Sequence, residues 1–187
     1  MKKILLASKS PRRREILEML RIPFTVVTVE GEDESYPKDL ESEEVAEYIS
    51  NKKADAFKHE LRDDELLVTA DTVVILENKI LGKPRDIADA KKMLHNLSGK
   101  THKVATGVTV ASNKKRESFT SISEVTFAHL SDEEINYYVD CFRPLDKAGA
   151  YGIQEWIGAV AVAKINGSFY NVMGLPVQKL YDTLKKF

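Results

Sequence analysis

The first thirty residues show an apolar segment, an amphipathic segment and a second apolar segment. Apolar Ile4–Ala7 predicts a short buried strand. Ser10 followed by Pro11 predicts a helix whose N-cap is the serine and whose first helical residue is the proline. The helical pattern ends before Pro23, and the β-rich run 24–29 predicts a second strand. Strands separated by a helix predict that the parallel part of the sheet is the N-terminal part.

The next segment is acidic and polar. Residues 30–44 include a proline and few apolar positions, so they predict a loop, one that can separate two lobes. Ser42 is placed to cap a helix whose apolar positions continue at roughly helical spacing to Phe57.

A single apolar strand pattern is broken by two polar residues. The run 66–70 predicts a strand that is interrupted at Asp71 and Thr72 and resumes over 73–76. Residues 77–79 then predict a hairpin turn.

The second half of the chain mixes hairpins with helices. The predicted elements are a helix over 86–97, an antiparallel pair of strands over 101–111 and 118–128, a helix with a capping box from Ser131, a hairpin of 160–165 with 168–171 over Asn166-Gly167, and a terminal helix over 176–186. No repeat or linker divides the chain. We therefore expect one α/β or mixed α+β domain over residues 1–187, built on a mixed sheet.

Composition narrows the class of protein. The 187 residues are 43% hydrophobic and 30% charged, as in a soluble globular protein, and can bury a core without disulfides. Lys and Arg number 28 against 29 Asp and Glu, a net charge of −1. No overall basic field exists to hold nucleic acid or an anionic membrane, so any anion site must be local.

The single cysteine and the N-terminus indicate where the protein acts. Cys141 has no partner for a disulfide, which fits a reducing compartment, and we expect its thiol to be buried. The apolar run after the first lysines is too short for a signal peptide, and no segment approaches the roughly 18 apolar residues of a membrane span. The expected location is the cytoplasm.

The segment SKSPRRR at residues 8–14 is a candidate phosphate site. A helix N-terminus is the positive end of a dipole, so arginines in its first turn are unfavourable there unless an anion is bound. Amides, hydroxyls and guanidinium groups that converge at a strand-to-helix turn suit phosphate. The alternative is a solvated basic turn, or one paired with Glu15 and Glu18.

Carboxylates provide the second candidate chemistry. Asp71 interrupts an apolar pattern, so it must be paired, bound to metal or exposed to a cleft, unless it is a turn residue that bonds its own backbone. The acidic residues 30–34 can supply oxygen ligands to a hard cation, although such a run is more often a solvated face.

Other candidates have weaker support from the residues alone. Lys53 and Lys83 are candidate phosphate contacts, and His102 is a candidate base for which a structural role is preferred. The Gly-rich segment 146–154 permits close approach of a ligand, and Gln154 at its end can read a base edge, but a tight structural turn explains the same glycines.

Taken together, these segments resemble the Maf family of nucleoside triphosphate pyrophosphatases, also called septum-formation inhibitors. The segments that carry the resemblance are LASKSPRRREIL at Leu6–Leu17, LVTADTVVI at Leu67–Ile75, GKPRD at Gly82–Asp86, LSGKTHKVATGV at Leu97–Val108, DKAGAYGIQ at Asp146–Gln154 and GSFYNVMGLP at Gly167–Pro176. The resemblance implies an elongated α/β fold related to inosine triphosphate pyrophosphatases, with a mixed twisted sheet flanked by helices and two lobes around a central cleft.

The resemblance also implies a reaction. It is hydrolysis between the α- and β-phosphates of a nucleoside triphosphate, dependent on Mg²⁺ or Mn²⁺, which gives a nucleoside monophosphate and pyrophosphate. Asp71 matches the proton acceptor that activates water and also helps to hold metal. Glu34 of the pair Asp33-Glu34 matches the loop metal ligand, although Glu32-Asp33 serves under a one-residue shift. The positions that match phosphate contacts are Ser8, Arg12, Arg13, Lys53 and Lys83, which fits stabilisation of a charged phosphoryl transition state.

The same resemblance implies a substrate. Arg12, Thr72 and Gln154 match the branch of the family that hydrolyses dTTP and UTP, whereas another branch prefers 7-methyl-GTP. The alternatives are a pyrophosphatase for modified purine nucleotides and a nucleotide-binding regulator of cell division. A homodimer is compatible with the resemblance, and no nucleic-acid or membrane partner is expected.

Overall fold

The computed structural model describes residues 2–28, 33–57 and 61–187, so the predicted strand end at Val29 and the acidic residues 30–32 lie outside the described residues. The strands are β1 (Lys3–Ala7), β2 (Phe24–Val27), β3 (Glu65–Leu76), β4 (Lys79–Leu81), β5 (Thr101–Ala111), β6 (Arg116–Phe127) and β7 (Val162–Asn166). The helices are α1 (Pro11–Glu18), α2 (Val45–Phe57), α3 (Ile87–Leu97), α4 (Asp132–Phe142), α5 (Trp156–Ala161), α6 (Phe169–Met173) and α7 (Val177–Leu184), with a short 3₁₀ turn η2 (Ala148–Ala150).

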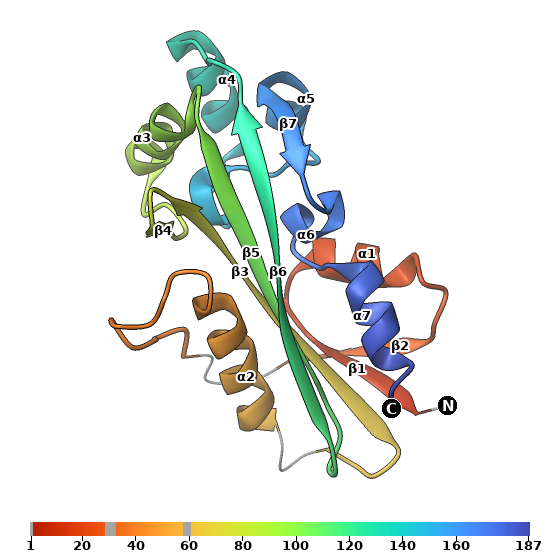
Figure 1. The fold of residues 1–187 in the computed structure, drawn as a ribbon. Coiled ribbons are helices and arrows are strands. Elements are labelled where there is room, and N and C mark those ends of the chain that lie inside the picture. Colours follow the sequence, from red (N-terminus) through yellow and green to blue (C-terminus); the bar gives the residue numbers. More distant parts are fainter. Residues whose placement is uncertain (1, 29–32, 58–60) are drawn as a thin grey trace. The chain divides into compact units, whose positions relative to one another are not determined.

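These strands form a single mixed sheet (Figure 1). Its order is β2-β1-β3-β5-β6-β7, and β4 pairs with β3. β1 runs parallel to both β2 and β3, whereas β3 with β4 and β6 with β7 are antiparallel. The predicted fold class is therefore confirmed, and so is the prediction that the parallel part is N-terminal.

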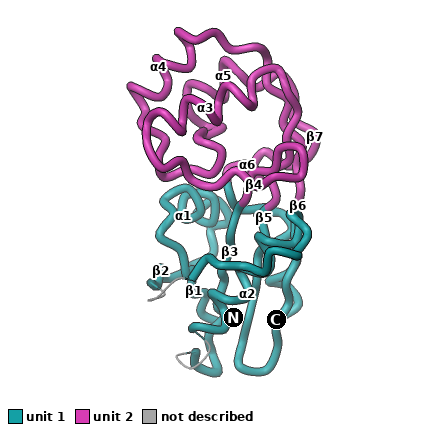
Figure 2. The backbone as a smooth tube through the Cα atoms, turned by 90° about the vertical axis from the view of Figure 1, so that its left-hand side faces the viewer, with its two compact units in different colours: residues 1–72, 106–121, 174–187 teal, residues 73–105, 122–173 magenta. Residues whose placement is uncertain are grey.

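Two compact units share these strands (Figure 2). Unit 1 comprises residues 1–72, 106–121 and 174–187, and unit 2 comprises residues 73–105 and 122–173. β3, β5 and β6 each contribute residues to both units. The prediction that the acidic loop separates two lobes is wrong, because its described part lies within unit 1. A single domain over residues 1–187 stays a prediction.

Helices cover both faces of the parallel strands in unit 1. Thr69 of β3 donates a hydrogen bond to the carbonyl of Ser50 in α2, while Thr72 is bonded to Arg13 in α1. Successive side chains of a strand point to opposite faces, and residues 69 and 72 are an odd number of positions apart. Their side chains therefore point to opposite faces of β3. α1 and α2 therefore lie on opposite sides of the strands, as Figure 1 shows.

Unit 2 has its own apolar core. The buried residues come from α3, α4, α5 and the unit 2 parts of β3, β5 and β6, and the largest that are fully buried are Leu94, Leu97, Phe127, Ile135, Tyr138 and Ile157. The capping box at Ser131 is confirmed, since the Ser131 and Glu134 side chains bond each other's backbone N–H groups.

Three predictions of local structure are wrong. β3 is continuous through Asp71 and Thr72, because both side chains find partners without a break in the strand. The predicted hairpin strand 168–171 is instead the start of α6: Ser168 Oγ accepts from the Asn171 backbone N–H at 3.3 Å, and β7 pairs with β6.

The third wrong prediction concerns the burial of Cys141. Cys141 is exposed, not buried. The buried residues of α4 are Ile135, Tyr138 and Val139, and position 141 lies off the face that they form.

Candidate active site

The candidate site in unit 1 lies where the parallel strands β1 and β3 meet. β1 lies between β2 and β3, and the chain passes first to β2 and then back across to β3. Such a reversal of direction is a topological switch point, and in open α/β sheets ligands bind beyond the carboxyl ends of the strands there. Ala7 pairs with Thr69, so the residues that follow β1 lie beside residues 70–72.

The turn from β1 into α1 has the predicted geometry. Ser10 is the N-cap of α1, where its hydroxyl accepts from the Arg13 backbone N–H at 3.5 Å. The Ser10 backbone N–H donates to the hydroxyl of Ser8, a buried residue, at 3.2 Å. Arg12 is half-buried in the first helical turn. The positive end of the helix dipole and two guanidinium groups thus share one corner of the unit.

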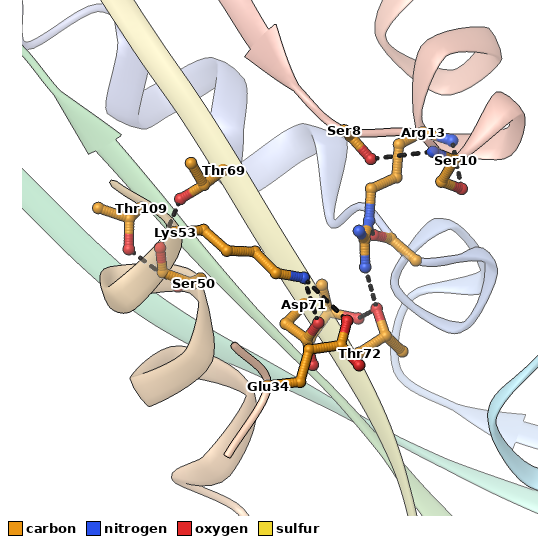
Figure 3. A network of polar contacts seen from close by, with 12 residues as sticks. Ser8, Ser10, Arg13, Glu34, Ser50, Lys53, Thr69, Asp71, Thr72 and Thr109 are labelled. Carbon is orange, nitrogen blue, oxygen red and sulfur yellow. Dashed lines mark hydrogen bonds and ion pairs between the residues drawn. The ribbon is translucent and has the colours of Figure 1, made fainter. Parts of the chain in front are cut away.

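The Arg13 side chain is held from two sides, and Figure 3 shows its contact with Thr72. Its Nε donates to the carbonyl of Gly174 at 2.8 Å, and its Nη2 donates to the hydroxyl of Thr72 at 3.0 Å. The Thr72 hydroxyl lies 2.9 Å from that of Thr106. Gly174 has a φ of +114°, which only glycine adopts without strain. This glycine belongs to the segment GSFYNVMGLP, which carries the family resemblance, and the structure places its carbonyl on Arg13.

Two carboxylates meet one ammonium group on the other face of β3 (Figure 3). The Nζ of Lys53, from α2, lies 2.9 Å from Asp71 Oδ1 and 3.3 Å from Glu34 Oε1. The side chains of Lys53 and Asp71 are 9% and 13% exposed, and that of Glu34 is 46% exposed. The structure thus brings together three residues that the sequence singled out separately.

The neighbouring acid of the loop has different partners. Asp33 accepts from Lys52 Nζ at 2.7 Å and from the Ser35 hydroxyl at 2.8 Å. These hydrogen bonds hold the pKa of Asp33 well below its usual range. Of the pair Asp33-Glu34, it is therefore Glu34 that reaches the ammonium group beside Asp71.

A buried hydroxyl network fixes the helix that carries Lys53. Ser50 Oγ lies 2.8 Å from Thr109 Oγ1, and Thr69 Oγ1 donates to the Ser50 carbonyl at 2.7 Å. α2 also packs directly on β5, where a Cβ on Gly107 would lie 2.2 Å from the Glu47 backbone nitrogen. None of these residues is predicted from the sequence, although threonines at 69, 106 and 109 in otherwise apolar strands were a signal.

The remaining predicted site residues belong to unit 2. Lys83 and Gln154 are exposed. Their two segments are adjacent within the unit, because the Gly149 N–H donates to the Gly82 carbonyl at 3.1 Å. A common site with the residues of unit 1 stays a prediction.

His102 has the structural role that the sequence favoured. It is 2% exposed, its Nε2 lies 2.7 Å from the Tyr151 hydroxyl, and burial lowers its pKa to about 4. The His102 imidazole is therefore neutral at physiological pH. It lies in the core of unit 2, where it packs against the rings of Phe127 and Tyr151.

A family model described as Maf-like protein matches residues 3–187. The chain belongs to the Maf family. It is 55% identical to the dTTP/UTP pyrophosphatase of Bacteroides thetaiotaomicron over 98% of this chain and 95% of that relative. It is also 55% identical to the dTTP/UTP pyrophosphatase of Parabacteroides distasonis over 99% of this chain and 96% of that one.

Among solved structures, a HAM1 protein from Coxiella burnetii matches with a TM-score of 0.55 at 16% identity, covering 100% of both chains. This likeness is one of fold.

The donor set of this Maf protein fits a hard divalent cation. Asp71 and Glu34 already converge on one positively charged nitrogen, and Mg²⁺ is commonly bound by one or two carboxylates together with water and substrate phosphates. Among the residues that the structure describes, no group of three or more His, Cys, Asp or Glu is placed to enclose a metal. The carboxylates thus suit a cation that completes its coordination with phosphate oxygens.

In the described part of the chain, every helix is too short or too polar to cross a membrane.

Proposed function

We propose that this Maf protein is a nucleoside triphosphate pyrophosphatase that hydrolyses dTTP and UTP to the monophosphate and pyrophosphate. The names of the two relatives at 55% identity support the substrate. The observation that carries the chemistry is the half-buried Asp71 carboxylate, which pairs with Lys53. The next residue, Thr72, accepts a hydrogen bond from Arg13 of α1, whose N-terminal end carries groups that can donate hydrogen bonds to phosphate.

In this proposal the Asp71 carboxylate is the general base. It takes a proton from a water molecule whose oxygen attacks the α-phosphorus, and the bond from that phosphorus to the bridging oxygen breaks, so that pyrophosphate leaves. The ammonium of Lys53 lies 2.9 Å from Asp71 Oδ1 and holds this partly buried carboxylate in place. General bases of this kind contribute about 10²–10⁴-fold to rate.

The triphosphate is bound by the basic groups. Arg12, Arg13, Ser8 and the N-terminal end of α1 bind phosphate oxygens, with Arg13 oriented by Thr72 and Gly174. Lys53 and Lys83 add positive charge. Asp71 and Glu34 would hold Mg²⁺ or Mn²⁺. When bound, the ion would neutralise negative charge on the phosphates.

Base selectivity is assigned to Thr72 and Gln154. The Gln154 amide offers a donor and an acceptor, which suits the edge of a uracil or thymine base. We further propose that the enzyme acts on free nucleotides in the cytoplasm. The net charge of −1 supports the absence of a nucleic-acid partner.

Pyrophosphate release tests the proposal. The purified protein is incubated with dTTP, UTP, CTP, 7-methyl-GTP or ITP, each with Mg²⁺ and with EDTA. Metal-dependent release with dTTP and UTP in the lead supports both reaction and substrate. A lead for 7-methyl-GTP or ITP would overturn the substrate while the reaction stands, and no release from any nucleotide would favour a binding regulator.

A further inference from the structure

A second hydroxyl lies behind the contact between Thr72 and Arg13. Thr106 Oγ1, on β5, lies 2.9 Å from Thr72 Oγ1, on β3, and these two strands are neighbours in the sheet. The Thr72 hydroxyl accepts a hydrogen bond from Arg13 Nη2 at 3.0 Å. Within unit 1, a chain of contacts thus runs from a buried strand to a guanidinium group of the candidate phosphate site.

The Thr106 hydroxyl lies in an apolar part of β5. Thr106 is fully buried, and so are the apolar residues Val104, Ala105 and Val108 of the same strand. Valine has the same branched shape and suits a buried strand, so packing alone does not require a threonine at this position. Burying a hydroxyl costs free energy unless it is hydrogen-bonded, and Thr106 shares a hydrogen bond with Thr72.

The place of the Thr72 hydroxyl depends on its side-chain rotamer. Rotation about χ1 moves the hydroxyl of a threonine to another staggered position, which would take the oxygen away from Arg13. A guanidinium group only donates hydrogen bonds, so Arg13 needs an acceptor at this point. The bond to Thr106 favours the observed rotamer, because any other rotamer would break it.

Two hydrogen bonds restrain the plane of the Arg13 guanidinium. Its Nε donates to the Gly174 carbonyl at 2.8 Å, and its Nη2 donates to Thr72. Both nitrogens belong to one rigid planar group, so the two bonds together restrain its orientation as well as its position. Loss of the Thr72 contact would remove one of these restraints and give the group more freedom to turn.

The orientation of a guanidinium group matters for phosphate. An arginine binds phosphate most strongly through two parallel N–H···O bonds, which require its plane to match the two oxygens. A side chain that becomes ordered only on binding loses conformational entropy, and this loss lowers the affinity. A guanidinium that is already oriented in the free protein avoids part of this cost.

We propose that Thr106 is a positioning residue for triphosphate binding, which orients the Arg13 guanidinium through the hydroxyl of Thr72. The inference rests on the proposed function, within which Arg13 binds phosphate oxygens. Thr106 is fully buried and acts through Thr72, so it takes no part in the chemical step. The contribution of Thr72 to binding is then partly independent of the base.

Binding of inorganic tripolyphosphate, measured by titration calorimetry in EDTA, tests this role. The probe has no base, so a contact between Thr72 and a base does not contribute. Thr106→Val should raise the Kd about fivefold, the scale of one hydrogen bond between neutral groups. Thr106→Ser keeps the hydroxyl and should bind nearly as tightly as the wild type. Thr72→Val should raise the Kd at least as much, and adding Thr106→Val to it should have no further effect.

Turnover of UTP with Mg²⁺ provides a second readout. Thr106→Val should raise the KM about fivefold and change kcat by less than about twofold, because the guanidinium binds phosphate in the substrate as well as in the transition state. A general loss of folded protein would instead lower kcat and leave the KM unchanged.

A matched control comes from the same strand. Thr101 Oγ1 lies 2.8 Å from Thr126 Oγ1, an exposed pair of threonine hydroxyls that belongs to unit 2. Thr101→Val removes this hydrogen bond and should change neither the Kd for tripolyphosphate nor the KM for UTP. Thermal unfolding of each variant shows whether the fold is intact, and if Thr106→Val fails to fold, Thr106→Ala is measured in its place.

The outcomes are distinct. An unchanged Kd in a folded Thr106→Val protein, or an equal rise in the Thr72→Val background, overturns the positioning role and leaves the proposed function intact. A wild-type protein that releases no pyrophosphate contradicts the proposed function, and the Kd for tripolyphosphate still decides the role of Thr106. A wild-type protein that binds no tripolyphosphate overturns the positioning role together with the phosphate site.

Discussion

Each unit contains a lysine with 9% of its side chain exposed between two carboxylates, but the two sites are built differently. The partners of Lys53 come from separate elements, the loop residue Glu34 and Asp71 of β3. The partners of Lys147 are Asp146 and Glu155, close in sequence, and the second of them is also bound by a buried tyrosine.

Under the proposed function, this difference separates a catalytic arrangement from a structural one. Glu34 is nearly half exposed, so a metal ion and phosphate can reach the carboxylates around Lys53. Glu155 is held both by the buried Tyr138 hydroxyl and by Lys147. Perturbing the first site should change catalysis, and perturbing the second should change the free energy of unfolding.

The largest expected effect is that of Asp71→Asn. Without the carboxylate, the attacking water has no base, and kcat should fall about 10³-fold. Nucleotide binding, measured by Trp156 fluorescence, should be retained because the basic corner is intact. Asp55→Asn, an exposed acid on α2, is the control. Near-normal turnover of Asp71→Asn would remove this residue as the base.

Lys147→Met tests the structural side of the comparison. The methionine fills a similar volume but leaves Glu155 without its cation, which should lower the free energy of unfolding by about 3 kcal/mol. Urea unfolding measures this loss. Lys91→Met removes a more exposed ion pair of the same unit and should cost less than about 1 kcal/mol. Equal losses for both lysines would contradict the distinction.

Acid should destabilise the protein through His102. Its pKa is about 4 in the folded protein against 6.5 for the free side chain, so below pH 6.5 the unfolded chain binds a proton that the folded chain does not. The contribution of His102 is fully present above pH 6.5, falls as the pH drops, and is lost by about pH 4, a change of about 3 kcal/mol at most. Urea unfolding between pH 7 and pH 4 measures the slope, and His102→Gln should flatten it. An unchanged slope in the variant would exclude this histidine as the source.

The smallest expected effect sharpens the role of Lys53. In Lys53→Met the two carboxylates lose a shared cation, so Mn²⁺ should take its place more readily than in the wild type. We expect Mn²⁺ to raise the Tm of the variant by about 2–4 °C more than that of the wild type, which corresponds to about 1 kcal/mol. A Glu34→Gln, Lys53→Met double variant should lose much of this difference. An equal rise in variant and wild type would show that Lys53 and the metal do not compete.

Much of the fold was accessible from short-range signals. The N-cap at Ser10 with Pro11, the capping box of Ser131 with Glu134, and the antiparallel turn after Leu76 were all predicted, and the structure confirms them. These features depend on contacts between residues at most four positions apart, so local sequence determines them.

The sequence by itself predicted which residues carry the chemistry, because the segments around Arg13 and Asp71 resemble those of the Maf family and the resemblance matches Lys53 to a phosphate contact. Only the tertiary structure decided how they are held. Asp71 does not break β3 because Lys53, 18 residues away, pairs with it, and Arg13 is oriented by a carbonyl 161 residues away at Gly174. Buried charges and hydrogen-bond donors find partners on segments that are far apart in the sequence and that the sheet brings together. A local sequence pattern cannot predict which segments these are.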